Sequence, residues 1–359
     1  MKLVNTLLLL LMTAPYFNVT AQKNDFAGAK LNDIQVIGSH NSYKIAIEKP
    51  LMDYLKAKSA ALSSLEYEHI PLTDQLNMGL RGLELDVFHD PNGGYHSDPG
   101  GLDIVRASGI TPLPFDEEEK LKKPGLKIFH VQEIDFRSHQ LLFKDALMEL
   151  KKWSDKNKGH TPIIITMNTK DAKIPQTRDP LVFDTEALKN LDDEIRAIIP
   201  QEKLITPDFV RGKRTTLEKA VLKDGWPKLD AVKGKFLFVL DEGDEKLDLY
   251  LENFPNLKGA VLFVNKEEGN PEAAFRIVND PVADFDKIRL LVKSGYMVRT
   301  RADGDTQEAR TNDYGRFEKA KASGAQIITT DYYAPSRFFP SNYKIRFDGV
   351  SFERIKNRG

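Results

Sequence analysis

Groups that can bind a metal ion or move a proton stand at the ends of three short apolar segments of this chain. His40 and Asn41 follow the apolar run 34–37, Glu84 and Asp86 lie within the run 80–88, and His130 lies near the end of the run 126–131. Imidazole changes its charge near neutral pH, and carboxylate and amide oxygens bind hard cations. The residue types therefore predict an enzyme that transfers protons beside a bound cation.

The two carboxylates have a spacing that suits a metal site. Glu84 and Asp86 are two residues apart, so on a strand their side chains point to the same face. Two carboxylates on one buried face repel each other unless a cation or a shared proton lies between them. With the amide oxygens of Asn41 and Asn168 they predict a site for Ca²⁺, with Mg²⁺ as the less favoured ion. The alternative is a pair of surface carboxylates on an edge strand.

The two histidines are more informative together than singly. A single histidine at a strand end is more often structural than catalytic. Beside a cation site, however, His40 and His130 offer a general base and a general acid, a pair that suits displacement at phosphorus.

The elements that must position these groups alternate between strands and helices. Amphipathic patterns at 141–153, 183–199 and 314–323 predict helices, the last one ended by Gly324. Eight strand-like runs lie between such helices, at 34–37, 80–88, 126–131, 162–167, 235–240, 260–264, 296–300 and 326–330. This number predicts an α/β fold of the (β/α)8 TIM-barrel type, with the polar residues at the C-terminal ends of its strands. An open doubly wound sheet is the alternative, and the polar inserts 44–75 and 97–125 are expected over the barrel mouth.

Length, charge and the N-terminus limit the class of protein. The chain has 359 residues, no cysteine, and 52 Lys and Arg against 53 Asp and Glu. Nearly balanced charge without a basic block argues against a nucleic-acid partner. Residues 3–12 are apolar but too few to span a bilayer, so residues 1–21 are predicted to be a cleaved signal peptide. We expect a secreted or periplasmic monomer with one catalytic domain, residues 22–359.

Five segments together resemble a known family. The likeness covers residues 31–335 and is to the calcium-dependent phosphoinositide phospholipases C of bacteria, which belong to the phospholipase-C-like phosphodiesterase barrels. The segments are 38–43 (GSHNSY), 83–87 (LELDV), 130–138 (HVQEIDFRS), 298–303 (VRTRAD) and 323–332 (SGAQIITTDY).

The resemblance implies a role for each candidate residue. His40 matches the general base that deprotonates the inositol 2-hydroxyl, and His130 matches the acid that protonates the leaving diacylglycerol oxygen. A cyclic inositol phosphate is the implied product, and a phosphoinositide or related polar lipid at a membrane surface is the implied partner. The implied calcium ligands are Asn41, Glu84 and Asp86.

The phosphate or inositol would be held by basic residues. Arg299 and Arg301 alternate on one strand and so point to one side, and Lys170 is a similar candidate. The alternative for the arginines is an exposed salt bridge to Asp303 or Asp305. Asp241 and Asp331 are expected to orient a lysine or arginine from beneath.

Two departures from the family pattern leave alternatives open. Asn168 stands where eukaryotic relatives place a glutamate ligand, which implies a less charged calcium site. His96 lies 12 residues after Glu84, as does the second histidine of glycerophosphodiester phosphodiesterases, and so competes with His130. That activity is the alternative function, although the chain lacks the His-Arg-Gly opening of that family. A non-catalytic barrel that binds phosphorylated ligands is the third possibility.

Overall fold

The structure, a computed structural model, describes residues 26–349 and 351–356. The expected signal peptide, residues 1–21, lies outside this part of the chain. Among the described residues, the search for a helix with the length and apolar character needed to cross a membrane finds none.

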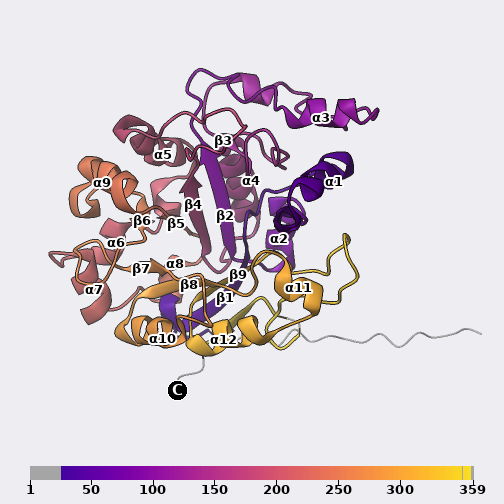
Figure 1. Ribbon diagram of the computed structural model, residues 1–359. Helices are drawn as coiled ribbons and strands as arrows, with labels where there is room; N and C mark the ends of the chain where they lie inside the picture. The colour runs from indigo at the N-terminus through magenta and orange to yellow at the C-terminus, as the bar shows by residue number, and fades with distance from the viewer. Residues whose placement is uncertain (1–25, 350, 357–359) are drawn as a thin grey trace, which may run out of the picture.

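Eight parallel strands form a nearly closed barrel (Figure 1). Their order around the ring is β1, β2, β4, β5, β6, β7, β8 and β9, and β9 pairs again with β1. Between β6 and β7 the ring closes through a parallel bridge from Asn265 to Phe275. The strands are β1 (Ile34–Ser39), β2 (Gly82–Phe88), β4 (Ile163–Thr169), β5 (Phe236–Leu240), β6 (Leu262–Val264), β7 (Phe275–Ile277), β8 (Met297–Arg301) and β9 (Ile327–Thr330). The predicted TIM-barrel class is confirmed.

The prediction for the third barrel strand is wrong. The run 126–131 forms only β3 (Lys127–Ile128), which pairs antiparallel with β2 and stands outside the ring. Leu126 and Ile128 are buried in the hydrophobic core and Phe129 packs against Phe88, although the run does not join the ring. The missing barrel strand is β7, where the charged Arg276 interrupts the short apolar run. A further short strand, β10 (Glu353–Ile355), pairs antiparallel with β1.

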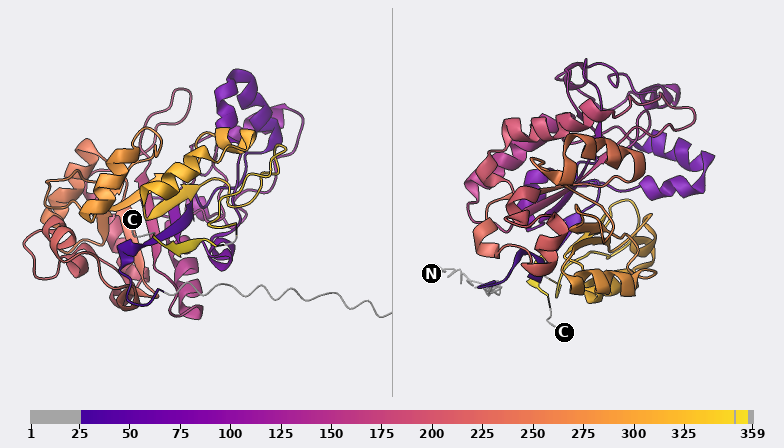
Figure 2. Two further views of the ribbon diagram at one scale, coloured as in Figure 1. Left: turned by 90° about the horizontal axis from the view of Figure 1, so that it is seen from below. Right: turned by 90° about the vertical axis from the view of Figure 1, so that its left-hand side faces the viewer.

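Helices surround the strands (Figures 1 and 2). The predicted helix at 141–153 is α4, which buries Ala146, Leu147, Leu150 and Trp153 along one side. The predicted helix at 314–323 is α12. It ends at Gly324, whose φ of +81° is a left-handed conformation that glycine adopts without strain. The helices are α1 (Lys49–Lys58), α2 (Leu72–Met78), α3 (Gly101–Ala107), α4 (Phe143–Lys156), α5 (Thr185–Ile198), α6 (Pro207–Arg211), α7 (Leu217–Lys223), α8 (Leu229–Val232), α9 (Asp244–Asn253), α10 (Phe285–Ser294), α11 (Gln307–Thr311) and α12 (Gly315–Ser323). Short 3-10 turns occupy Leu31–Asp33, Ala60–Leu65, Lys120–Lys122, Gln201–Lys203 and Pro255–Leu257.

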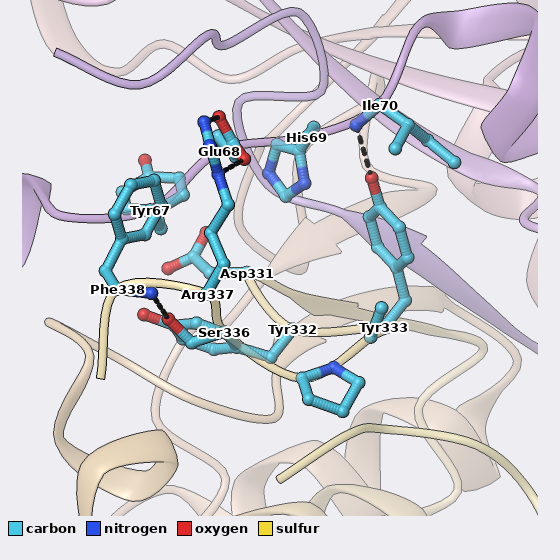
Figure 3. Close-up of a pocket in the computed structure, with 12 residues that line it drawn as sticks. Tyr67, Glu68, His69, Ile70, Asp331, Tyr332, Tyr333, Ser336, Arg337 and Phe338 are labelled. Carbon is cyan, nitrogen blue, oxygen red and sulfur yellow. Dashed lines mark hydrogen bonds and ion pairs between the residues drawn. The ribbon is translucent and has the colours of Figure 1, made fainter. Parts of the chain in front are cut away.

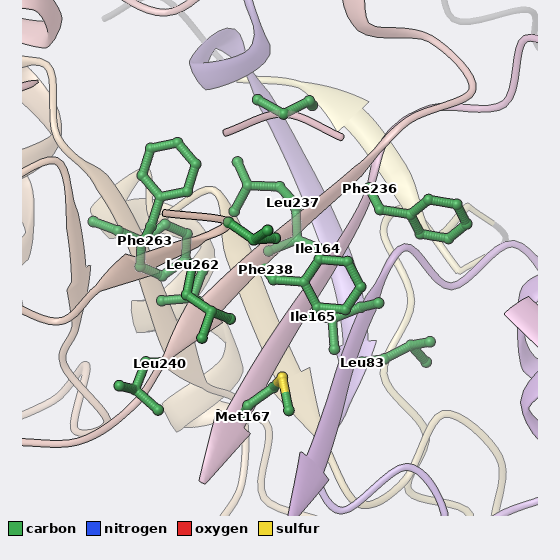
Figure 4. Packing of buried hydrophobic residues seen from close by; sticks show 14 of the residues in the cluster. Leu83, Ile164, Ile165, Met167, Phe236, Leu237, Phe238, Leu240, Leu262 and Phe263 are labelled. Carbon is green, nitrogen blue, oxygen red and sulfur yellow. The ribbon is translucent and has the colours of Figure 1, made fainter. Parts of the chain in front are cut away.

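The main core lies around β2, β4, β5 and β6 (Figure 4). Leu83, Leu85 and Val87 of β2 are buried in it. Since successive strand residues face opposite sides, Glu84 and Asp86 point the other way, into the barrel mouth. This alternation is the reason that a buried strand can carry two carboxylates.

Two features position the site at the barrel mouth. β1 and β2 approach closely where Gly38 pairs with Gly82, and a Cβ on Gly38 would lie 2.6 Å from the Gly82 backbone. The inserts that follow β1 and β2 carry α1 and α3, which pack together through Leu51, Leu55 and Val105 and project from the barrel (Figure 2). The inserts therefore stand at the end of the barrel that holds His40 and Glu84.

Candidate active site

A pocket of about 220 Å³ lies at the C-terminal ends of the barrel strands. It collects nine of the ten predicted site residues, and His96 is the exception. Its lining consists of His40, Asn41, Glu84, Asp86, His130, Asn168, Lys170, Asp241, Asn279, Arg299 and Arg301. Residues separated by as many as 261 positions in the sequence thus meet in one pocket, as is typical of barrel enzymes.

His40 has polar contacts at both of its ring nitrogens. Its Nδ1 lies 2.8 Å from Oδ1 of Asp331, and its Nε2 lies 3.3 Å from Nη1 of Arg301 and 3.7 Å from Oε1 of Glu84. A guanidinium can only donate, so the contact with Arg301 favours a neutral ring with the proton on Nδ1 and a lone pair on Nε2. That tautomer accepts a proton from the pocket side.

Asp331 is the buried partner that sets this orientation. Burial would raise the pKa of Asp331, but the positive charge of His40 when protonated and that of Arg301 hold it well below its usual value. Arg301 Nη2 lies 3.0 Å from Oδ2 of Asp331, so the carboxylate joins both groups. Asp331 therefore contacts Arg301, in agreement with the prediction that it orients a lysine or arginine. It also contacts His40, which was not predicted.

Aromatic residues flank His40 and its backbone. The Tyr67 ring stacks against His40 at a centroid distance of 6.2 Å. His69 Nε2 lies 2.6 Å from the His40 carbonyl oxygen, and its ring stacks on Tyr333. Figure 3 shows Tyr67 and His69, from the segment after β1, facing the segment after β9 that carries Asp331 and Tyr333. These contacts keep the imidazole from turning out of the pocket.

His130 has a parallel arrangement. Its Nδ1 lies 2.8 Å from Oδ2 of Asp135, and Oδ1 of Asp135 lies 2.6 Å from Nζ of Lys44. Asp135 and Lys44 are both buried, whereas the His130 side chain is 18% exposed. Each pocket histidine is thus backed by a carboxylate that also contacts a cation.

The carboxylates Glu84 and Asp86 converge on one point. Nδ2 of Asn168 lies 3.1 Å from Glu84 and 3.0 Å from Asp86, which places the amide between them. Burial would raise the pKa of Asp86, but Lys170, 3.1 Å away, and His130 hold it below its usual value. Asp86 is therefore ionised at neutral pH.

The donor set fits a hard cation. The Asn168 amide lies within hydrogen-bond distance of both Glu84 and Asp86, and turning that amide directs its oxygen toward the two carboxylates. Asn41 has a left-handed backbone with φ of +50°, and its Nδ2 donates to the Tyr67 hydroxyl at 2.7 Å. Among the described residues, no three His, Cys, Asp or Glu form a metal-binding group. Two carboxylates and two amides are the set that the sequence predicted.

The arginines form buried contacts in the pocket rather than exposed salt bridges. Arg299 is 2% exposed, pairs with Glu84, and donates to Asn279 at 2.6 Å. Arg301 pairs with Asp331 and not with Asp305. The surface alternative for these residues is therefore wrong.

Asp241 lines the pocket opposite His40. Burial raises its pKa to about 6, an effect that the Glu84 carboxylate increases and Arg299 opposes. The contact of Asp241 is with Asn265, at 3.4 Å, so the expectation that it orients a lysine or arginine is not matched by a hydrogen bond or ion pair within the described chain.

His96 lies away from the pocket. Its ring packs against Phe88, Tyr95 and Phe129, and burial lowers its pKa to about 4. His96 lies in the loop after β2, outside the pocket, although it is only 12 residues from Glu84 in the sequence. The structure therefore does not bring the competing histidine to the site.

Sequence reasoning missed Asn279 and Lys44. Asn279 follows β7, so overlooking that strand also hid the residue. Lys44 lies four residues after His40, but no local pattern shows that it meets Asp135, 91 positions away. Both omissions concern contacts between distant segments.

Comparison with known proteins identifies the family. The family model described as "Phosphoinositide phospholipase C, Ca2+-dependent" matches residues 29–357. A search of curated proteins gives no match.

Two solved structures share the fold. The calcium-dependent phosphoinositol-specific phospholipase C of a Pseudomonas species is 16% identical, with a TM-score of 0.55 over 91% of this chain and 96% of that one. The Ca²⁺-dependent phosphatidylinositol-specific enzyme of Streptomyces antibioticus is 17% identical, with a TM-score of 0.51 over 85% and 95% of the two chains. With nearly the whole described chain matched by the family model, this protein belongs to the Ca²⁺-dependent phosphoinositide phospholipase C family.

Proposed function

We propose that this phosphodiesterase cleaves phosphatidylinositol-type lipids by attack of the inositol 2-hydroxyl on phosphorus. The products are diacylglycerol and a cyclic inositol phosphate. The observation that carries the proposal is the pocket with two histidines, each backed by a buried carboxylate. One proton acceptor and one proton donor are what an intramolecular displacement at phosphorus requires.

His40 acts as the base in this mechanism. Its Nε2 lone pair takes the proton of the 2-hydroxyl while that oxygen bonds to phosphorus. The imidazolium that results is stabilised by Asp331 at 2.8 Å. Because Arg301 also contacts Nε2, it must shift its hydrogen bond to a phosphoryl oxygen as the substrate enters.

His130 acts as the acid. It gives its proton to the glycerol oxygen as the bond from that oxygen to phosphorus breaks. Asp135 holds Nδ1, which leaves Nε2 as the donor toward the pocket. The protons and the leaving group therefore balance without a water molecule in this step.

The basic residues and the calcium ligands stabilise charge. Arg299, Arg301 and Lys170 line the pocket and would hold phosphoryl or inositol oxygens. Asn41, Glu84, Asp86 and Asn168 would hold Ca²⁺, which when bound neutralises phosphoryl charge and acidifies the attacking hydroxyl.

The test follows the products by phosphorus NMR. Purified protein is incubated with phosphatidylinositol vesicles, with Ca²⁺ and with a chelator. We expect a cyclic phosphate signal that requires Ca²⁺ and is lost in His40→Ala. A linear phosphate formed without a cyclic intermediate, or turnover unaffected by the chelator, would overturn the proposal; release of glycerol phosphate would indicate the diester hydrolase instead.

We also propose that the mature protein works outside the cytoplasm, as a monomer with one catalytic domain. The apolar segment 3–12 followed by small and polar residues supports export. Sequencing the N-terminus of the exported protein tests it: a first residue near 22 is expected, and a retained Met1 would contradict it.

A further inference from the structure

Lys44 is a buried cation that the mechanism above does not use. Its side chain is 0% exposed and lies on the segment that follows His40. A lysine is almost never fully buried unless it is paired. Its Nζ lies 2.6 Å from Oδ1 of Asp135 and 5.0 Å from the centre of the Tyr67 ring.

Asp135 links this lysine to His130. One carboxylate oxygen contacts Lys44 and the other contacts Nδ1 of His130 at 2.8 Å. The turn from His130 to Asp135 is tight, with Glu133 at φ of +71° and paired backbone hydrogen bonds between Val131 and Asp135. Small movements of the carboxylate therefore pass directly to the imidazole.

Lys44 also joins the two halves of the site. His40 and Lys44 belong to the segment after β1, whereas His130 and Asp135 belong to the connection between β2 and β4. Backbone pairing between Lys44 and Ser138 aligns the two segments. The Tyr67 ring, which Lys44 faces, stacks on His40. The lysine thus contacts both the segment that carries His40 and the segment that carries His130.

We propose that Lys44 is a positioning residue that orients His130 through Asp135 and weakens the hold of His130 on its proton. This inference rests on the proposed role of His130 as the acid. A bare Asp135 carboxylate would bind the imidazolium strongly and make it a poor proton donor. The positive charge of Lys44, 2.6 Å from Asp135, offsets part of that attraction, so His130 gives up its proton more readily than it would beside Asp135 alone.

Other charges near His130 come from the neighbouring strands. Asp86 of β2 acts on it electrostatically, and Lys170 after β4 and Asp241 after β5 line the same pocket. An adjoining pocket that His130 also lines adds further groups: Asp171, Glu242 and Lys246. These groups stay in place when Lys44 is replaced, so a change in proton release can be assigned to Lys44.

The test compares Lys44→Met with wild-type enzyme across pH. Methionine keeps the length of the side chain and removes its charge. We expect the alkaline limb of kcat/KM to move up by roughly one pH unit and kcat to fall about tenfold, with KM little changed. Lys44→Arg should restore the limb, because it restores the charge.

The matched control is Lys49→Met, which removes an exposed lysine paired with Asp53 on the same segment. It should behave as the wild type, since exposed pairs contribute little. A folded Lys44→Met whose pH profile matches that of Lys49→Met would overturn the proposal.

A second measurement covers the case in which Lys44→Met does not fold. The protein is labelled with isotopes at histidine for NMR, and the His130 signal is identified by its loss in His130→Gln. The pH titration of this signal is then compared between Asp135→Asn and the double variant Asp135→Asn with Lys44→Met. We expect a higher midpoint in the double variant, because the uncompensated lysine charge is gone. Equal midpoints would overturn the proposal. Full activity of His130→Ala on phosphatidylinositol would instead overturn the proposed acid, and the titration would still test Lys44.

Discussion

Each of the two pocket histidines contacts an aspartate that is paired with a cation. The two cations differ in burial: one lines the pocket, and the other is shielded from it. His40 contacts Asp331 and His130 contacts Asp135, both at 2.8 Å, and each aspartate pairs with a cation. Arg301, the cation on the His40 side, lines the pocket and contacts the imidazole itself. Lys44, on the His130 side, is wholly buried behind the carboxylate.

This difference agrees with the proposed roles of His40 as the base and His130 as the acid. A histidine base must present a lone pair on one nitrogen, so its tautomer matters. An arginine beside it can also move its hydrogen bond to the phosphate group that the 2-hydroxyl attacks. An acid needs only to hold and release a proton, so a fixed charge behind it is sufficient. If His40 with Asp331 and Arg301 acts as the base, and His130 with Asp135 and Lys44 as the acid, changes in the two groups should have different effects.

The largest expected effects come from removing the histidines. His40→Ala and His130→Ala should each lower kcat on phosphatidylinositol by about 10²–10⁴-fold. With an inositol phosphate ester of a nitrophenol, which leaves without protonation, His130→Ala should lose less than about tenfold while His40→Ala stays impaired. Steady-state rates on both substrates measure this, and equal losses on both would remove the distinction between acid and base.

The next effect concerns the aspartates. Asp331→Asn should lower kcat by about 100-fold or more, because an asparagine can donate to Nδ1 and so place the ring proton on Nε2 of His40. Asp135→Asn should cost only about tenfold, because protonated His130 carries protons on both nitrogens. The ratio of the two kcat values is the measurement, and a larger loss in Asp135→Asn would reverse the comparison.

A smaller effect is expected at Asn168, one of the proposed calcium ligands. Asn168→Asp adds a third carboxylate beside Glu84 and Asp86, so the Ca²⁺ concentration for half-maximal activity should fall about tenfold. Titration of activity with Ca²⁺ measures it. The control is Asn157→Asp at the exposed end of α4, which should leave the calcium requirement unchanged. A weaker calcium response in Asn168→Asp would show that Asn168 is not a ligand.

The smallest effect on activity is expected for a histidine outside both networks. His96→Gln should leave kcat unchanged but alter the pH dependence of stability. The folded pKa of His96 is about 4 against an ordinary 6.5, so only the unfolded chain takes up a proton in that range. Stability therefore falls as pH drops from about 6.5 to about 4, by up to about 3 kcal/mol from this group.

The measurement for His96 is denaturant unfolding at pH 7 and at pH 4.5. The free energy of unfolding should fall less in His96→Gln than in the wild type between these two pH values. His69 and His160, whose pKa values burial also lowers to about 4, keep the remaining acid sensitivity. A fall in kcat comparable to that of His130→Ala would return His96 to the site.

Much of the barrel and the core of the site followed from local patterns. Seven of the eight barrel strands lie where apolar runs predicted them, and β7 was missed because Arg276 interrupts its short apolar run. The alternation along β2 correctly predicted that Glu84 and Asp86 share one face. The run at 126–131 was misread because burial outside the barrel ring and burial within it select the same apolar residues.

The sequence by itself determined the residue types and the face on which each one stands. It also determined the family, since the motifs around His40, Glu84 and His130 are recognisable in the chain. Only the tertiary structure decided which partners meet: Asp331 with His40, Lys44 with Asp135, and Asn279 with Arg299. It also placed His96 among aromatic rings outside the pocket. The physical reason is that periodicity records each residue's own burial, whereas contacts between distant segments depend on how the closed barrel brings strand ends together.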